Sequence, residues 1–130
     1  MYKVVVSAGS LRPNPAEGVV LPHRWTTEGV IAQFDFTGAH LYHLAAAGCI
    51  LNDLYREADH LGIKIDGARV YAFGGFHGDT WESTGVMYEV DVLSKAPQVD
   101  IAHLLTVVDD VAEIPKALRS GTTVVRHLAG

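Results

Sequence analysis

One long helix constrains this chain of 130 residues more than any other feature of its sequence. Thr37 is a residue type favoured at helix N-caps and Gly62 is a typical C-terminal stop, so residues 38–61 are predicted to form an uninterrupted helix. Apolar residues recur along it at helical spacing and predict the stripe that packs on the chain's own sheet. That stripe consists of Leu44, Ala47, Leu51, Leu54, Tyr55 and Ala58.

The first half of this helix needs a second cover. Residues 41–51 are apolar or small around almost the whole circumference, whereas the back face is polar from Asn52 onward. A helix that is apolar all round must be buried on both sides, and the sheet can supply only one of them. Because residues 45–49 are all small, the second cover can approach closely. We interpret this half as a homodimer interface with Cys49 near it.

Strands and shorter helices surround the long helix in the sequence. Patterns rich in β-branched or alternating residues predict strands at residues 3–8, 19–21, 29–36, 63–73, 84–93 and 122–128, with turns at 9–18 and 74–79. Asp100 is predicted to cap a second helix over residues 101–112, and Pro115 suits the first turn of a short helix at 116–119. The order β-β-β-α-β-β-α-α-β has no βαβα rhythm and predicts an α+β fold. Without a repeat or a linker, residues 1–130 are expected to form a single domain.

Charge and hydropathy exclude several classes of partner. The chain has 10 Lys and Arg against 15 Asp and Glu, and its net charge of -5 argues against sequence-independent nucleic-acid binding. No apolar run approaches the roughly 20 residues that a membrane span requires. The first residues do not form a signal-peptide core. We therefore expect a cytoplasmic protein with no membrane or nucleic-acid partner.

Cys49 is the only cysteine, which excludes an intramolecular disulfide and a multi-cysteine zinc site. On the predicted helix it points away from the core stripe, on the same side as Asp53, Arg56 and His60. A nearby cation lowers the pKa of a thiol, whereas the Asp53 carboxylate opposes ionisation. Buried single cysteines are commonly inert. The residues alone leave open whether Cys49 is reactive or only packed.

A pair of histidines and a pair of glycines do not indicate a metal site or a phosphate-binding site. His40 and His43 lie on the first turn of the long helix, but helical spacing does not bring Cys49 together with them, so no metal site is predicted. Gly74 and Gly75 are followed by Phe76 rather than by a helix, which is typical of a turn and not of a phosphate cradle. We expect no cofactor.

The helix sequence resembles that of a known family. Residues 38–49 read Gly-Ala-His-Leu-Tyr-His-Leu-Ala-Ala-Ala-Gly-Cys and resemble the Glu-x-Leu-x-x-Ala-x-x-x-Cys helix of the OsmC/Ohr family. The following strand pair, the second helix and the ending from Pro115 to Val124 match the family's layout. The resemblance implies antiparallel sheets wrapped around a long central helix in an intertwined homodimer, with active sites at the subunit interface. Many members are stress-response proteins that reduce organic hydroperoxides through a reactive cysteine, a resolving cysteine and a dithiol donor.

Only part of the family's machinery carries over. Cys49 falls on the reactive cysteine, and Arg12 or Arg24 could stand for the arginine that holds it as thiolate. The resolving cysteine is absent, since residues 111–115 read Val-Ala-Glu-Ile-Pro, and the family's glutamate falls on Ala39. The two-cysteine cycle therefore cannot run within this chain.

Two hypotheses remain, besides the weaker one of a purely structural subunit. In the first, Cys49 is the nucleophile of a one-cysteine peroxidase, activated by Arg12 or Arg24 and reduced by an external small-molecule thiol. In the second, a non-catalytic homodimer binds a small apolar or electrophilic ligand at the subunit interface. A Cys49 pKa well below the free value of ~8.5 favours the first, and one near or above it favours the second.

Overall fold

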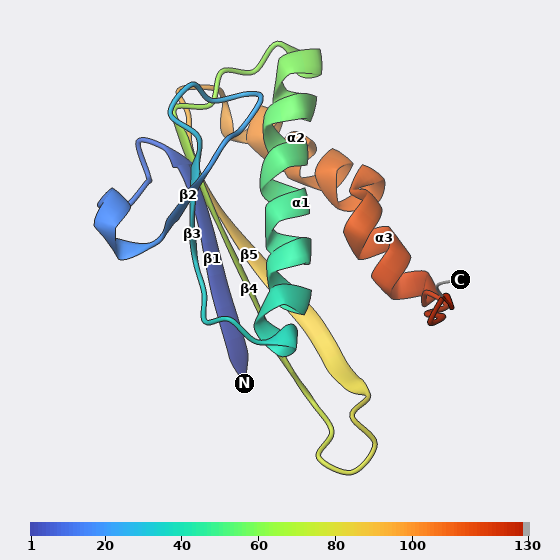
Figure 1. Ribbon diagram of the computed structural model, residues 1–130. Helices are drawn as coiled ribbons and strands as arrows, with labels where there is room; N and C mark the ends of the chain where they lie inside the picture. Colours follow the sequence, from blue (N-terminus) through green and yellow to red (C-terminus); the bar gives the residue numbers. More distant parts are fainter. Residues whose placement is uncertain (129–130) are drawn as a thin grey trace.

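One five-stranded antiparallel sheet forms a layer of the protein, which the computed structural model describes over residues 1–128 (Figure 1). The strand order across the sheet is β2-β3-β1-β4-β5. The strands are β1 (Tyr2–Gly9), β2 (Val19–Leu21), β3 (Val30–Gln33), β4 (Gly67–Phe76) and β5 (Ser83–Leu93), with a 3₁₀ turn, η1 (Pro15–Glu17), between β1 and β2. Long helices and an antiparallel sheet confirm the predicted α+β class.

Small and β-branched side chains line the inner face at the centre of the sheet. Val4, Val6 and Ala8 of β1 alternate along the strand and are almost completely buried. Their neighbours on β4, from Ala68 to Ala72, alternate in the same way, and Val6 stands opposite Val70 in the register. These short side chains let a helix approach the sheet closely.

Helix α1 (Gly38–Leu61) lies on this face, against β1 and β4 (Figure 1). Its bounds are those predicted, and both ends have the expected caps. The hydroxyl of Thr37 accepts a hydrogen bond from the His40 N–H at 3.1 Å, and Gly62 takes the left-handed conformation (φ 71°). The predicted stripe forms the core of the contact, since all its members except the partly buried Leu44 are buried.

Two shorter helices, α2 (Gln98–Val111) and α3 (Glu113–Ser120), pack against α1. The second helix begins at Gln98, with Pro97 at the N-cap position, so Asp100 lies inside the first turn rather than capping it. Arg119 of α3 donates a hydrogen bond to Asp109 of α2 at 2.9 Å, and Asp109 also accepts one from Tyr88 of β5. This shared carboxylate ties both helices to the sheet.

The predicted last strand is wrong. Residues 122–128 have no regular secondary structure and are exposed, as the 91% exposure of Val124 illustrates. Their β-branched composition favours a strand, but a strand also needs a neighbour, and within residues 1–128 the segment pairs with none.

Two strand boundaries also differ from prediction. The strand predicted at 29–36 is shorter, and the one predicted at 63–73 is shifted toward the hairpin. Gly74 and Gly75 therefore belong to β4 and not to the turn. A Cβ atom at Gly74 would overlap the carbonyl oxygen of Gly85 and lie 2.7 Å from Nε2 of His43, so the glycine allows the hairpin and α1 to meet.

Strand β5 is an edge strand whose outer side has no partner among the described residues. Its side chains alternate as predicted: Val86, Tyr88, Val90 and Val92 are partly buried, and Met87, Glu89, Asp91 and Leu93 are exposed.

No helix within residues 1–128 is long and apolar enough to cross a membrane.

Candidate functional site

Cys49 lies at the middle of α1, under the start of α3. Its sulfur accepts a hydrogen bond from the backbone N–H of Ile114 at 3.5 Å, and its S–H donates to Oδ2 of Asp53 at 4.0 Å. The residue is only 9% exposed. The predicted proximity of Asp53 is confirmed, whereas the cover over Cys49 comes from this chain's own α3.

Asp53 is a fully buried carboxylate, which its place on the predicted polar back face of the helix did not indicate. Arg56, one turn further along α1, places Nη2 3.0 Å from Oδ2 of Asp53. The same guanidinium lies 3.4 Å from Glu57 and 4.0 Å from Glu113. A single arginine thus neutralises part of the charge of three carboxylates.

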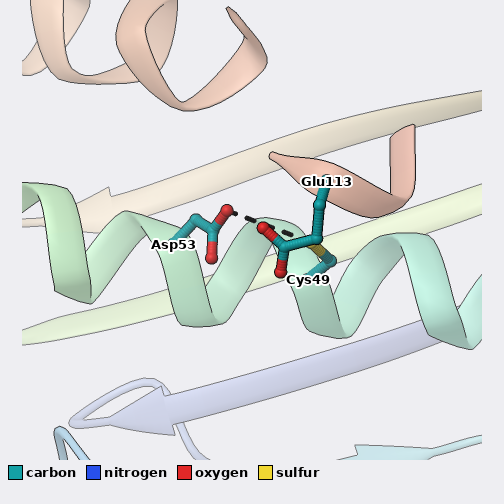
Figure 2. Close-up of side chains that lie close together, drawn as sticks. All are labelled: Cys49, Asp53 and Glu113. Atoms are coloured by element: carbon teal, nitrogen blue, oxygen red, sulfur yellow. Dashed lines mark hydrogen bonds between the residues drawn. The ribbon is translucent and has the colours of Figure 1, made fainter. Parts of the chain in front are cut away.

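The side chains of Cys49, Asp53 and Glu113 converge between α1 and α3 (Figure 2). One sulfur or oxygen atom of each lies within 4.8 Å of the others. A metal ion could bridge atoms at this spacing, but the guanidinium of Arg56 already lies against both carboxylates. The positive charge beside the cluster is therefore supplied by the protein itself.

This surrounding holds Cys49 as a neutral thiol. Burial, with a smaller contribution from the Asp53 and Glu113 carboxylates, raises the pKa of Cys49 to about 11, against the N–H of Ile114, which lowers it. Burial also raises the pKa of Asp53, although the hydrogen bond from Asn52 and the ion pair with Arg56 oppose the shift. The sequence left open which neighbour of the thiol dominates; burial contributes most to its pKa, and the charged groups that act on it are the Asp53 and Glu113 carboxylates.

A cavity of about 420 Å³ opens beside Cys49, between α1, the β1–β3 side of the sheet and the start of α3. Its polar lining consists of Cys49 itself with His23, Asn52 and Glu113. The rest of its wall is apolar or small: Val6, Leu21, Val30, Ala32, Leu44, Ala45, Gly48, Leu51 and Ile114. A pocket with such walls and a few polar groups is typical of a small-molecule site.

The structure does not bring the two candidate arginines to this cluster. Arg12 donates hydrogen bonds to the carbonyl and the carboxylate of Glu28, both at 3.1 Å. Arg24 lies over the ring of Trp25, 5.4 Å from its centroid. Within residues 1–128, neither forms a hydrogen bond or an ion pair with Cys49. The cation of the cluster is Arg56.

Three polar residues of the site were not predicted. Asn52 adjoins Asp53 on α1, and its side-chain amide donates a hydrogen bond to Oδ1 of Asp53 at 3.2 Å. Its position in the sequence, three residues after Cys49 on the predicted helix, could have indicated this role. His23 follows β2 and Glu113 opens α3. Both are distant from Cys49 in sequence, and no motif connects them to it.

Comparison with solved structures supports the fold. The chain resembles the crystal structure of an OsmC-like hydroperoxide resistance protein from Jannaschia sp. CCS1, with a TM-score of 0.54 and 12% sequence identity. The match covers 100% of this chain and 95% of that one. No protein-family model matches the sequence, and no curated protein is recognisably related to it. The resemblance therefore establishes an OsmC-like fold.

Proposed function

We propose that this OsmC-like chain binds a small apolar molecule in the cavity beside Cys49. The observation that carries the proposal is a largely apolar cavity of about 420 Å³ with a buried thiol, flanked by two carboxylates, on its wall. Such walls favour an apolar ligand because each Å² of apolar surface removed from water contributes about 25 cal/mol. With a pKa of about 11, roughly one thiol in ten thousand is ionised at pH 7, so Cys49 serves as part of the wall.

Filling the cavity tests this proposal. Gly48 lines the cavity, and a Cβ atom there would meet nothing within 4 Å, so Gly48→Leu should occupy the cavity while favouring the helix. Gly78→Leu is the matched control, because Gly78 also has open space around it but lies in the exposed β4–β5 turn. Isothermal titration with 2-phenyl-2-propanol should show binding to the wild type and to Gly78→Leu. Unchanged binding to Gly48→Leu would contradict the proposal.

A second function is favoured by the fold neighbour, which is described as an OsmC-like hydroperoxide resistance protein. In this scheme the Cys49 thiol attacks an organic hydroperoxide, giving a sulfenic acid and the corresponding alcohol. One external thiol then forms a mixed disulfide with loss of water, and a second thiol releases Cys49 and an external disulfide. The hydrogen bond from the Ile114 N–H to the sulfur would support the developing thiolate.

Hydroperoxide consumption with an added thiol separates the two functions. If Cys49 reacts, Cys49→Ser should abolish consumption above the uncatalysed rate while leaving binding of the alcohol probe intact. If the wild type and Cys49→Ser consume hydroperoxide equally, the peroxidase function is rejected and ligand binding remains.

We further propose that the chain acts as a homodimer. Leu41 and Ala45 of α1 are exposed, as are Val124, Val125 and Leu128 of the C-terminal segment, and a second copy could cover them. Light scattering after gel filtration should give twice the 14.0 kDa mass of the chain. A mass of one chain at micromolar concentration would reject the dimer.

A further inference from the structure

Helix α3 is joined to α2 through a single non-helical residue. Ala112 has a ψ of 119°, which interrupts the helical path between Val111 and Glu113, and its side chain is fully buried. No side-chain hydrogen bond caps the start of α3. The two helices are therefore separate segments that meet at a point fixed in the core.

Packing alone holds α3 weakly. Of its eight residues only Pro115 is buried. The segment that follows, residues 122–128, is exposed and pairs with no strand in the described part of the chain, so it does not anchor the end of the helix. A helix of two turns is not stable by itself in water, so α3 persists only while its contacts with α1 and α2 persist.

Hollow space borders α3 on two sides. Glu113 and Ile114 at its start line the cavity of about 420 Å³ beside Cys49. Leu118 and Arg119 line a second cavity of about 330 Å³ between α1 and β5. The remaining wall of the second cavity consists of Tyr42, Ala46, Ser83, Gly85, Val86, Tyr88 and Pro115. Protein interiors are normally close-packed, so a helix beside two cavities lacks part of the contact that would hold it in place.

Three polar contacts complete the attachment of α3. Arg119 pairs with Asp109 of α2 at 2.9 Å, and both side chains are about half exposed. Arg56 of α1 approaches the carboxylate of Glu113 at 4.0 Å. The backbone N–H of Ile114 donates a hydrogen bond to the thiol sulfur at 3.5 Å. Exposed ion pairs contribute little stability because water and salt screen them.

We propose that α3 is a gate over Cys49, which opens by pivoting at Ala112 while α1, α2 and the sheet stay folded. With α3 in place Cys49 is only 9% exposed, because the start of α3 covers it. Segments with few buried contacts open at a lower free energy than the whole protein unfolds. Opening separates Ile114 from the sulfur and uncovers both the thiol and the cavity beside it. The gate controls access to the site of the proposed function, but its test follows the thiol alone, so either can fail without the other.

The rate at which iodoacetamide alkylates Cys49 measures how often the gate is open. Arg119→Gln removes a contact that holds α3 without touching the thiol, so alkylation should become about two- to fivefold faster, as expected for loss of an exposed ion pair. The factor should be the same at pH 7, 8 and 9, because Arg119 is not among the groups that shift the pKa of Cys49. Arg119→Lys should restore part of the wild-type rate. Lys64→Gln, in the loop between α1 and β4, is the control that removes one exposed positive charge.

Low concentrations of urea separate opening of the gate from global unfolding. Opening of α3 alone exposes little surface, so the alkylation rate should change little with urea below the unfolding transition. Hydrogen exchange should be faster for the amides of α3 than for those of α1, and Arg119→Gln should accelerate only those of α3. The gate would be overturned by equal alkylation rates in wild type and Arg119→Gln. It would equally be overturned by an alkylation rate that rises with urea as steeply as the equilibrium constant of unfolding.

Discussion

The thiol of Cys49 donates its hydrogen to the carboxylate of Asp53 one turn further along α1, with 4.0 Å between Sγ and Oδ2. This pair reverses the usual arrangement of a reactive cysteine, in which a cation stabilises the thiolate. Arg56 is close, but it lies against Asp53 at 3.0 Å and reaches the thiol only through that carboxylate. Asp53 therefore separates the thiol from the cation of the cluster.

Removing the Asp53 charge should make Cys49 more reactive. The carboxylate raises the pKa of the thiol, so Asp53→Asn should lower that pKa and speed alkylation by iodoacetamide at pH 8. Asp59→Asn is the control, because Asp59 is an exposed acidic residue on the same helix. Equal alkylation rates for wild type and Asp53→Asn would show that burial alone sets the thiol pKa.

The free energy of unfolding should fall as the pH rises from about 9 to about 11. In this range the unfolded chain releases the Cys49 proton while the folded chain, with its pKa of about 11, retains it. The contribution of Cys49 is about 2–3 kcal/mol at the upper limit. Tyr55, whose pKa burial raises to about 12, adds a further loss, so urea unfolding of Cys49→Ala provides the reference. A constant difference between wild type and Cys49→Ala across this range would refute the assignment.

Arg56→Gln should destabilise the fold by about 2 kcal/mol, because it leaves the fully buried Asp53 carboxylate without its cation. The effect is smaller than for a wholly buried pair, since the Arg56 side chain is 31% exposed. Adding Asp53→Asn should restore part of the stability. Arg119→Gln breaks an exposed pair with Asp109 and should cost under about 1 kcal/mol. Urea unfolding of Arg56→Gln, Asp53→Asn, the double variant and Arg119→Gln measures these changes in the free energy of unfolding. Additive effects of Arg56→Gln and Asp53→Asn would argue against a stabilising ion pair between the two residues.

Gly74→Ala should cost about 1–3 kcal/mol, because its methyl group would overlap the backbone carbonyl of Gly85 and press on His43. Gly85 lies at an irregular point of the β4–β5 ladder, but its carbonyl is a backbone group and cannot move aside as cheaply as the end of a side chain. Gly78→Ala, at a glycine with open space, should change the melting temperature little. Similar melting temperatures for the two variants would show that the hairpin adjusts freely.

Local signals predicted the regular structure near α1 well. Thr37 and Gly62 act through backbone hydrogen bonds within a few residues, so the sequence shows both ends of the helix. The strand predicted at residues 122–128 was wrong because a strand needs a neighbouring strand, which can come from any part of the sequence, and composition does not indicate one.

The residues of the candidate site that lie on α1 could likewise be predicted, whereas those from other segments could not. Helical spacing placed Asp53 and Arg56 near Cys49, and the structure confirms the first contact directly and the second through Asp53. His23 and Glu113 reach the site because a loop and a helix from distant parts of the chain fold onto α1. Their role depends on tertiary packing, which local periodicity does not encode.

The outer side of β5 pairs with no other strand within residues 1–128 and leaves its backbone hydrogen-bonding groups free. An open edge of eleven residues offers backbone groups to any other strand, which is how sheets of separate molecules join into aggregates. Glu89 and Asp91 project from the exposed face of this strand, so two molecules meeting edge to edge would bring like charges together. Repulsion between these carboxylates disfavours fibrous association through this edge, and acid or high salt would weaken that repulsion.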